Sequence, residues 1–124
     1  MSNLYLKNRV PNGSKLELSI VGADAAADSA FVGSARLVLD DGKEEVWDDA
    51  DVHPGPKTKK LASPKSYVWR VRVAFTGAQT SAAIIRAHIE KPNNGGVFGD
   101  PYEFEVEGKN GDIARATIMA VTEK

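Results

Sequence analysis

The sequence predicts an all-β protein, folded as an antiparallel two-sheet β-sandwich of seven or eight strands. Two observations support this fold class. Apolar and polar residues alternate with a period of two in several segments, and Asn-Gly or Asp-Gly dipeptides stand between such segments. Strands with one apolar face each need a second sheet to cover that face. A two-layer sandwich is therefore favoured over a small barrel.

The clearest strand runs from residue 67 to residue 75. Its odd positions are all large and apolar, while Arg70 and Arg72 occupy even positions. Because successive side chains of a strand point to opposite faces, this strand buries its apolar side and exposes its arginines. The same alternation predicts strands over residues 16–20, 82–90 and 102–107.

Four further segments have weaker strand patterns, and we expect strands there as well: 4–10, 35–39, 44–47 and 113–121. Turn signals separate them, and each predicts a hairpin between antiparallel neighbours: Asn12-Gly13, Asp41-Gly42, Asn110-Gly111 and the longer Thr76–Thr80. Residues 23–29 favour at most one short helical turn. The segment 48–64, with three prolines, is predicted to be a long connection.

Length and composition indicate one domain over residues 1–124, large enough for a single core. The absence of cysteine excludes a disulfide scaffold, a thiolate metal site and a cysteine nucleophile. A formal net charge of −1 argues against nucleic-acid and membrane partners. The first residues resemble no signal segment, which predicts a cytoplasmic protein; a secreted protein whose leader has been removed is the alternative.

The strand count is loosely immunoglobulin-like. The chain nevertheless lacks the pair of cysteines with an intervening tryptophan that is typical of antibody domains. The likeness is therefore one of architecture and implies no function.

One candidate binding surface consists of arginines on the outward faces of two strands. Arg70 and Arg72 belong to one strand and Arg86 to the next, and arginines in such an arrangement donate bidentate hydrogen bonds to anions. The alternative interpretation is structural. If the strand over 102–107 pairs beside the strand of Arg86, its glutamates form cross-strand ion pairs that set the register.

The segment from Lys91 to Pro101 is a second candidate surface, because eleven residues make a long loop in a small sandwich. Asn93, Asn94 and Asp100 offer hydrogen-bond acceptors, and Phe98 offers an apolar contact. This mixture suits a sugar, a peptide or a protein partner. The alternative is a crossover in which Phe98 closes the end of the core.

Acidic residues gather in the segment 40–51, which contains seven of them. Asp48, Asp49 and Asp51 are the candidate ligands for calcium, which prefers closely spaced carboxylates. The spacing lacks the ladder of an EF-hand loop, so a solvated acidic surface is the alternative. No cofactor is otherwise implied.

Catalysis is not predicted. The chain has two histidines, His53 and His88, and neither belongs to a zinc-binding His pair or accompanies a nucleophile-elbow serine. We therefore expect a non-catalytic binding module for a protein or a modest polar ligand, with self-association through open sheet edges as one form of partnership. The alternatives are a carbohydrate-binding, lectin-like module assisted by calcium and, less favoured, a hydrolase with a dispersed site.

Overall fold

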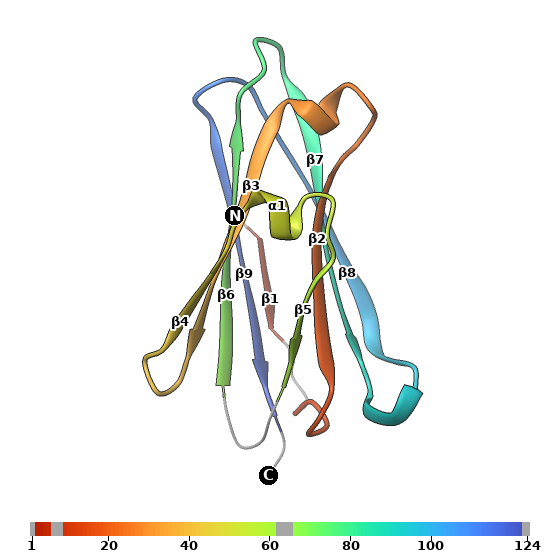
Figure 1. Ribbon diagram of the computed structural model, residues 1–124. Coiled ribbons are helices and arrows are strands. Elements are labelled where there is room, and N and C mark those ends of the chain that lie inside the picture. The colour runs from red at the N-terminus through yellow and green to blue at the C-terminus, as the bar shows by residue number, and fades with distance from the viewer. Residues whose placement is uncertain (1, 6–8, 62–65, 123–124) are drawn as a thin grey trace.

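The computed structural model describes residues 2–5, 9–61 and 66–122, and these form two β-sheets packed face to face (Figure 1). The five-stranded sheet has the order β1-β9-β6-β3-β4, and the four-stranded sheet has the order β5-β2-β7-β8. The predicted two-sheet sandwich is confirmed. The strands are β1 (Ser2–Tyr5), β2 (Lys15–Gly22), β3 (Phe31–Leu39), β4 (Glu44–Trp47), β5 (Lys57–Lys60), β6 (Ser66–Phe75), β7 (Ser81–Glu90), β8 (Val97–Gly108) and β9 (Ile113–Val121).

The core lies between the sheets and follows the alternation of the sequence. In β6 every odd position from Tyr67 to Phe75 is buried, whereas Arg70 and Arg72 are exposed, as predicted. The Trp69 ring lies 6.3 Å from the Trp47 ring and stacks on Tyr67 at 5.8 Å. Opposite them, the other sheet contributes buried leucines and isoleucines from β2 and β7.

Three of the four predicted hairpins are wrong. Only Asp41-Gly42 joins two paired strands, β3 and β4. The turns at Asn12-Gly13, Thr76–Thr80 and Asn110-Gly111 each connect one sheet to the other. A glycine with positive φ allows the chain to reverse, but the local sequence does not specify whether the next strand pairs alongside or crosses to the opposite layer. Gly13 and Gly111 have the expected positive φ of 88° and 95° all the same.

The boundaries of several elements also differ from the expectation. β1 is short and pairs parallel to β9, and residues 6–8 of the predicted strand 4–10 lie outside the described residues. The predicted connection 48–64 contains the short helix α1 (Asp49–Val52) and the edge strand β5. The sequence of β5 is Lys-Thr-Lys-Lys, which contains no apolar residue from which a strand could be predicted.

The predicted loop 91–101 is also shorter than expected, because β8 begins at Val97. Its Pro101 is tolerated because β8 is an edge strand, where a missing N–H breaks no ladder. The expected helical turn is present as the single-turn 3-10 helix Ala27–Ser29. None of the helices in the described part of the chain has the length and apolar character needed to cross a membrane.

Candidate functional site

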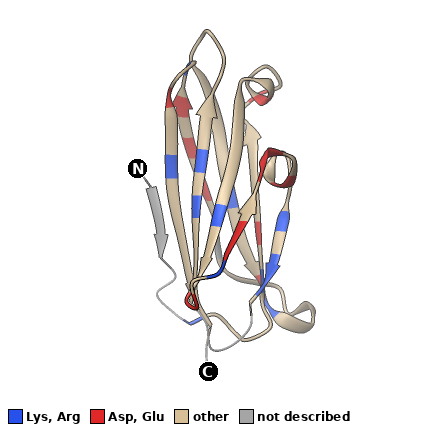
Figure 2. Ribbon diagram, turned by 60° about the vertical axis from the view of Figure 1, so that its left-hand side comes forward, with Lys and Arg blue, Asp and Glu red and all other residues tan. Residues whose placement is uncertain are grey.

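Four arginines form a band across the outer face of the five-stranded sheet, and we call Arg36, Arg70, Arg72 and Arg115 the arginine band. Arg36 of β3 stands directly opposite Arg70 of β6, and Arg72 stands directly opposite Arg115 of β9. All four are exposed. Figure 2, with lysines and arginines in blue, shows blue segments on neighbouring strands of the sandwich. Strand register alone therefore brings residues far apart in the sequence to one surface.

The arginine band is not neutralised within the described residues. None of its members has an ion pair there, and both cross-strand pairs place like charges opposite each other. Such an arrangement costs stability, since like charges directly across a sheet repel. An anion bound between the guanidinium groups relieves that repulsion and accepts bidentate hydrogen bonds.

The band lines an open hollow of about 400 Å³ that also includes Ser34, Thr117, Val46 and Glu44, the last being its single acidic side chain. Exposed apolar side chains flank the hollow. Val46 is 67% exposed beside Arg36, and Val32 and Ile113 form a further row with Ala74 toward one end of the sheet. The face thus combines cations with aliphatic contact area, as protein interfaces do.

Arg86 does not belong to the band, although the sequence grouped it with Arg70 and Arg72. β7 lies in the other sheet, so Arg86 points from the opposite outer face of the sandwich. Its Nε donates a hydrogen bond of 2.7 Å to Glu103, its direct partner on β8. Arg86 therefore forms a cross-strand ion pair, which was the alternative to a binding role.

The segment 91–101 is the hairpin that joins β7 to β8. Asn93 and Asn94 are exposed in left-handed conformations, with φ of 59° and 57°, and line a hollow of about 240 Å³ beside Lys15 and Lys60. Phe98 is half-buried against the core, as the alternative interpretation expected, although within one sheet and not at a crossover. Asp100 lies in β8, and its side chain is outside the described part.

The three candidate calcium ligands have local structural partners. Asp48 and Asp51 form a reciprocal capping box at the start of α1, with N–O distances of 3.3 and 3.0 Å. Asp49 accepts a 2.7 Å hydrogen bond from the Gly33 N–H. The described residues contain one group of three metal-ligating side chains at close range, and it lies elsewhere, at Glu17, His88 and Glu90.

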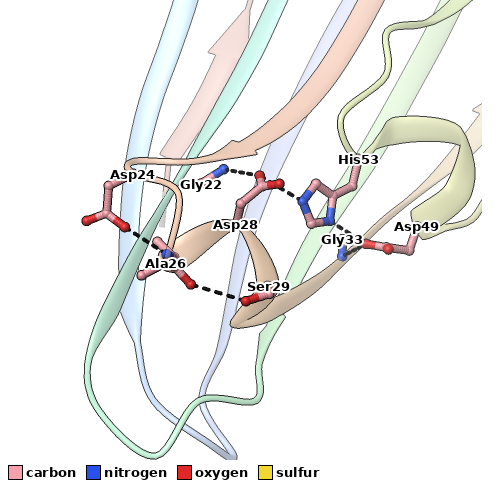
Figure 3. Close-up of polar contacts among 9 residues, drawn as sticks. Gly22, Asp24, Ala26, Asp28, Ser29, Gly33, Asp49 and His53 are labelled. Atoms are coloured by element: carbon pink, nitrogen blue, oxygen red, sulfur yellow. Dashed lines mark hydrogen bonds and ion pairs between the residues drawn. The ribbon is translucent and has the colours of Figure 1, made fainter.

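His53 is held between two carboxylates (Figure 3). Its Nδ1 lies 3.1 Å from Asp49 and its Nε2 lies 3.0 Å from Asp28, while its ring stacks on Phe31 at 4.3 Å. Because a carboxylate only accepts, the imidazole donates both bonds when it carries its second proton. Burial by itself lowers the pKa of His53, but the hydrogen bonds and charges of Asp28 and Asp49 outweigh it and raise that pKa.

The hydrogen bonds around His53 also change the pKa of Asp28. The hydrogen bond from the Gly22 N–H lowers the pKa of Asp28, and the bond from His53 lowers it further. Both ring nitrogens of His53 contact carboxylates, and no serine is bonded to the imidazole among the described residues. The arrangement is therefore one that connects chain segments. It joins the 3-10 turn, α1 and the ends of β2 and β3.

Three large aromatic side chains that could stack on a sugar if they were exposed lie in the core instead. Trp47, Trp69 and Tyr67 are at most 2% exposed, and the Tyr5 side chain lies outside the described part. Sequence reasoning missed Arg36 and Arg115 as members of the band. Both residues alternate with buried residues on their strands, so the sequence could have predicted that they point outward.

Comparisons with known proteins do not place the chain. It matches no model of a known protein family, and neither curated proteins nor solved structures match it. The structure is that of a two-layer β-sandwich, whose surfaces are the places where a ligand or partner can bind.

Proposed function

We propose that this protein is a non-catalytic binding module that docks an acidic protein partner on the outer face of its five-stranded sheet. The observation that carries the proposal is the arginine band, in which four exposed guanidinium groups face one another across the strands without a carboxylate partner in the described residues. A partner's carboxylates supply the missing counter-charges.

The surroundings of the band favour a protein over a nucleic acid. Val46, Val32 and Ile113 offer exposed aliphatic surface beside the arginines, which matches the mixture of apolar and charged groups on an acidic protein face. Single-stranded nucleic acids are held by exposed aromatic side chains on which bases stack. The band has none among its lining residues, and the net charge of −1 gives little long-range attraction for phosphates.

The proposal is tested by fluorescence anisotropy with a labelled peptide of alternating Glu and Val. The wild-type protein should bind this peptide, and should bind the corresponding Lys-Val peptide and an oligonucleotide of equal negative charge much more weakly. Arg70→Gln with Arg72→Gln should weaken binding about ten-fold or more, since hydrogen bonds between charged groups contribute roughly 1.5–3 kcal/mol each.

Arg86→Gln is the matched control, because it removes the same charge from the opposite sheet, where Glu103 already pairs with it. This variant should bind the Glu-Val peptide as the wild type does. Equal weakening by the control, or preference for the oligonucleotide, would contradict the proposal.

A further inference from the structure

A cluster of metal-ligating side chains lies on the outer face of the four-stranded sheet, opposite to the arginine band. Glu17 of β2 pairs directly with His88 of β7, and Glu90 follows two residues later on the same face. One oxygen from each glutamate and one ring nitrogen lie within 4.8 Å of one another. His88 Nε2 is 2.5 Å from Glu17 Oε2.

The backbone holds these groups rigidly. β2 and β7 are the two central strands of their sheet, and the alternate positions Leu16, Leu18 and Ile89 are buried in the core. The side chains themselves are partly covered: Glu17 is 18%, His88 33% and Glu90 45% exposed. Ligands on neighbouring strands of a packed sheet are more precisely placed than ligands on a loop.

A β-bulge lies beside the histidine. β8 pairs Tyr102 with Ala87 and Phe98 with Ile89, so residues 99–101 stand opposite His88 alone. Bulges interrupt the ladder and redirect side chains, and they are frequent next to functional sites. The irregularity in this sheet is therefore at the same position as its metal-ligating cluster.

The surrounding charges leave the cluster anionic. Lys15 approaches Glu90 at 3.8 Å, and both side chains are about half exposed, so this ion pair is weak. Lys60 pairs with Lys15 in the register and is exposed, and Arg86, on the same face of β7, is held by Glu103. Two carboxylates and one imidazole thus face one nearby ammonium group, that of Lys15.

We propose that Glu17, His88 and Glu90 bind a divalent ion of the zinc class. One nitrogen and two oxygens form a ligand set that zinc accepts, with bonds of about 2.0–2.2 Å and a fourth position open to water. Tetrahedral ligands at these bond lengths lie ~3.3 Å apart, so side-chain ends within 4.8 Å need to move by only about 1 Å. His88 binds the ion through Nε2 and keeps its one ring proton on Nδ1, so the ion takes the place of the contact between Nε2 and Glu17 Oε2.

Titration calorimetry of the metal-free protein with zinc chloride tests the site. We expect saturable one-to-one binding, and cobalt in the same position should give the visible absorption of a low-symmetry site. His88→Gln and Glu17→Gln should each abolish saturable binding while the melting curve of the metal-free variant stays cooperative. Lys15→Gln should tighten binding about two- to five-fold, because it removes the cation that competes for Glu90.

Two controls separate this site from other ligands. His53→Gln removes the other histidine, and Glu105→Gln removes an exposed glutamate of the same sheet; both should bind zinc as the wild type does. Absence of one-to-one binding in the wild type, or its retention in His88→Gln, would overturn the proposal. Both results are independent of the peptide binding proposed for the arginine band, which the opposite sheet carries.

Discussion

His53 shows how one side chain connects segments that are distant in the sequence. It follows α1, yet it contacts Asp28 beyond β2 and Phe31 at the start of β3. Its side chain is 10% exposed. In the sequence His53 precedes Pro54, and nothing local indicates that two carboxylates meet its ring.

The contacts of His53 with Asp28 and Asp49 predict that the stability of the protein depends on pH. Since the folded protein holds the pKa of His53 above its ordinary value of 6.5, the stabilisation is complete below that pH and is lost as the pH rises through the raised value. Asp28 acts at the other end of the range. Its pKa is lowered from 3.8, so its contribution is present above pH 3.8 and is lost as the pH falls through the lowered value.

We therefore expect His53→Gln to lower the melting temperature by ~5 °C near pH 6, and by less near pH 9. Differential scanning calorimetry of both proteins across this range gives the comparison. His88→Gln in metal-free buffer serves as the control, because that histidine contacts neither Asp28 nor Asp49. A difference between wild type and His53→Gln that stays constant from pH 6 to 9 would mean that the imidazolium form is not what the carboxylates stabilise.

At the scale of elements, the central strands β3, β6 and β9 carry like charges in register. Arg72 and Arg115 stand opposite each other without a carboxylate partner in the described residues, so their repulsion is part of the folded state. Natural surfaces usually intersperse both signs of charge. This unfavourable repulsion is expected on a face that receives its counter-charges from a binding partner.

Arg72→Gln should accordingly stabilise the isolated protein at low ionic strength by roughly 0.2–1 kcal/mol, while it weakens binding to the Glu-Val peptide. Urea denaturation measures the difference, which should shrink in 1 M salt because screening acts within about 3 Å there. Arg86→Gln should show the opposite sign, since it breaks the pair with Glu103. Destabilisation by Arg72→Gln would show that the arginine band does not repel itself.

The edge strand β5 carries two lysines on its inward side. Lys57 and Lys59 pair with the buried Leu18 and Leu16, so both lysines point inward. Lys59 reaches Glu45 of β4 in the other sheet, and that hydrogen bond lowers the pKa of Glu45. Inward charges at an edge are a known means of preventing association.

Replacing both inward lysines, Lys57→Val with Lys59→Val, should produce soluble oligomers or aggregates, which light scattering after gel filtration detects. The matched control is Thr58→Val with Lys60→Val, which changes the outward face of the same strand. This control should elute at the same position as the wild type. If both double variants associate equally, the direction of the lysines is not the protective feature.

The whole molecule is stabilised by the apolar layer between the sheets. Ile85 is fully buried in the centre of β7, and Ile20, its direct partner on β2, is also fully buried. Gly33 lets the two layers approach closely, because a Cβ at this position would lie 2.8 Å from Ile20 Cδ1. Packing of this kind does not relax readily around a missing side chain.

Ile85→Ala should therefore lower the free energy of unfolding by about 2–5 kcal/mol in urea denaturation. Val46→Ala, on the exposed face of β4, should change it by less than ~0.5 kcal/mol. A small effect at Ile85 would place the core elsewhere than between the sheets.

The sequence by itself determined which side chains are buried in the strongly alternating strands, because the period-two pattern of a segment such as Tyr67 to Phe75 depends only on the geometry of a strand. It also determined where the chain turns, through Gly13, Gly42 and Gly111. Only the tertiary structure decided which strands share a sheet. A turn has the same backbone requirement whether the chain continues in one sheet or crosses to the other. For this reason only the structure shows that Arg36 and Arg115 lie beside Arg70 and Arg72 on the five-stranded sheet. Arg86 lies on the outer face of the other sheet.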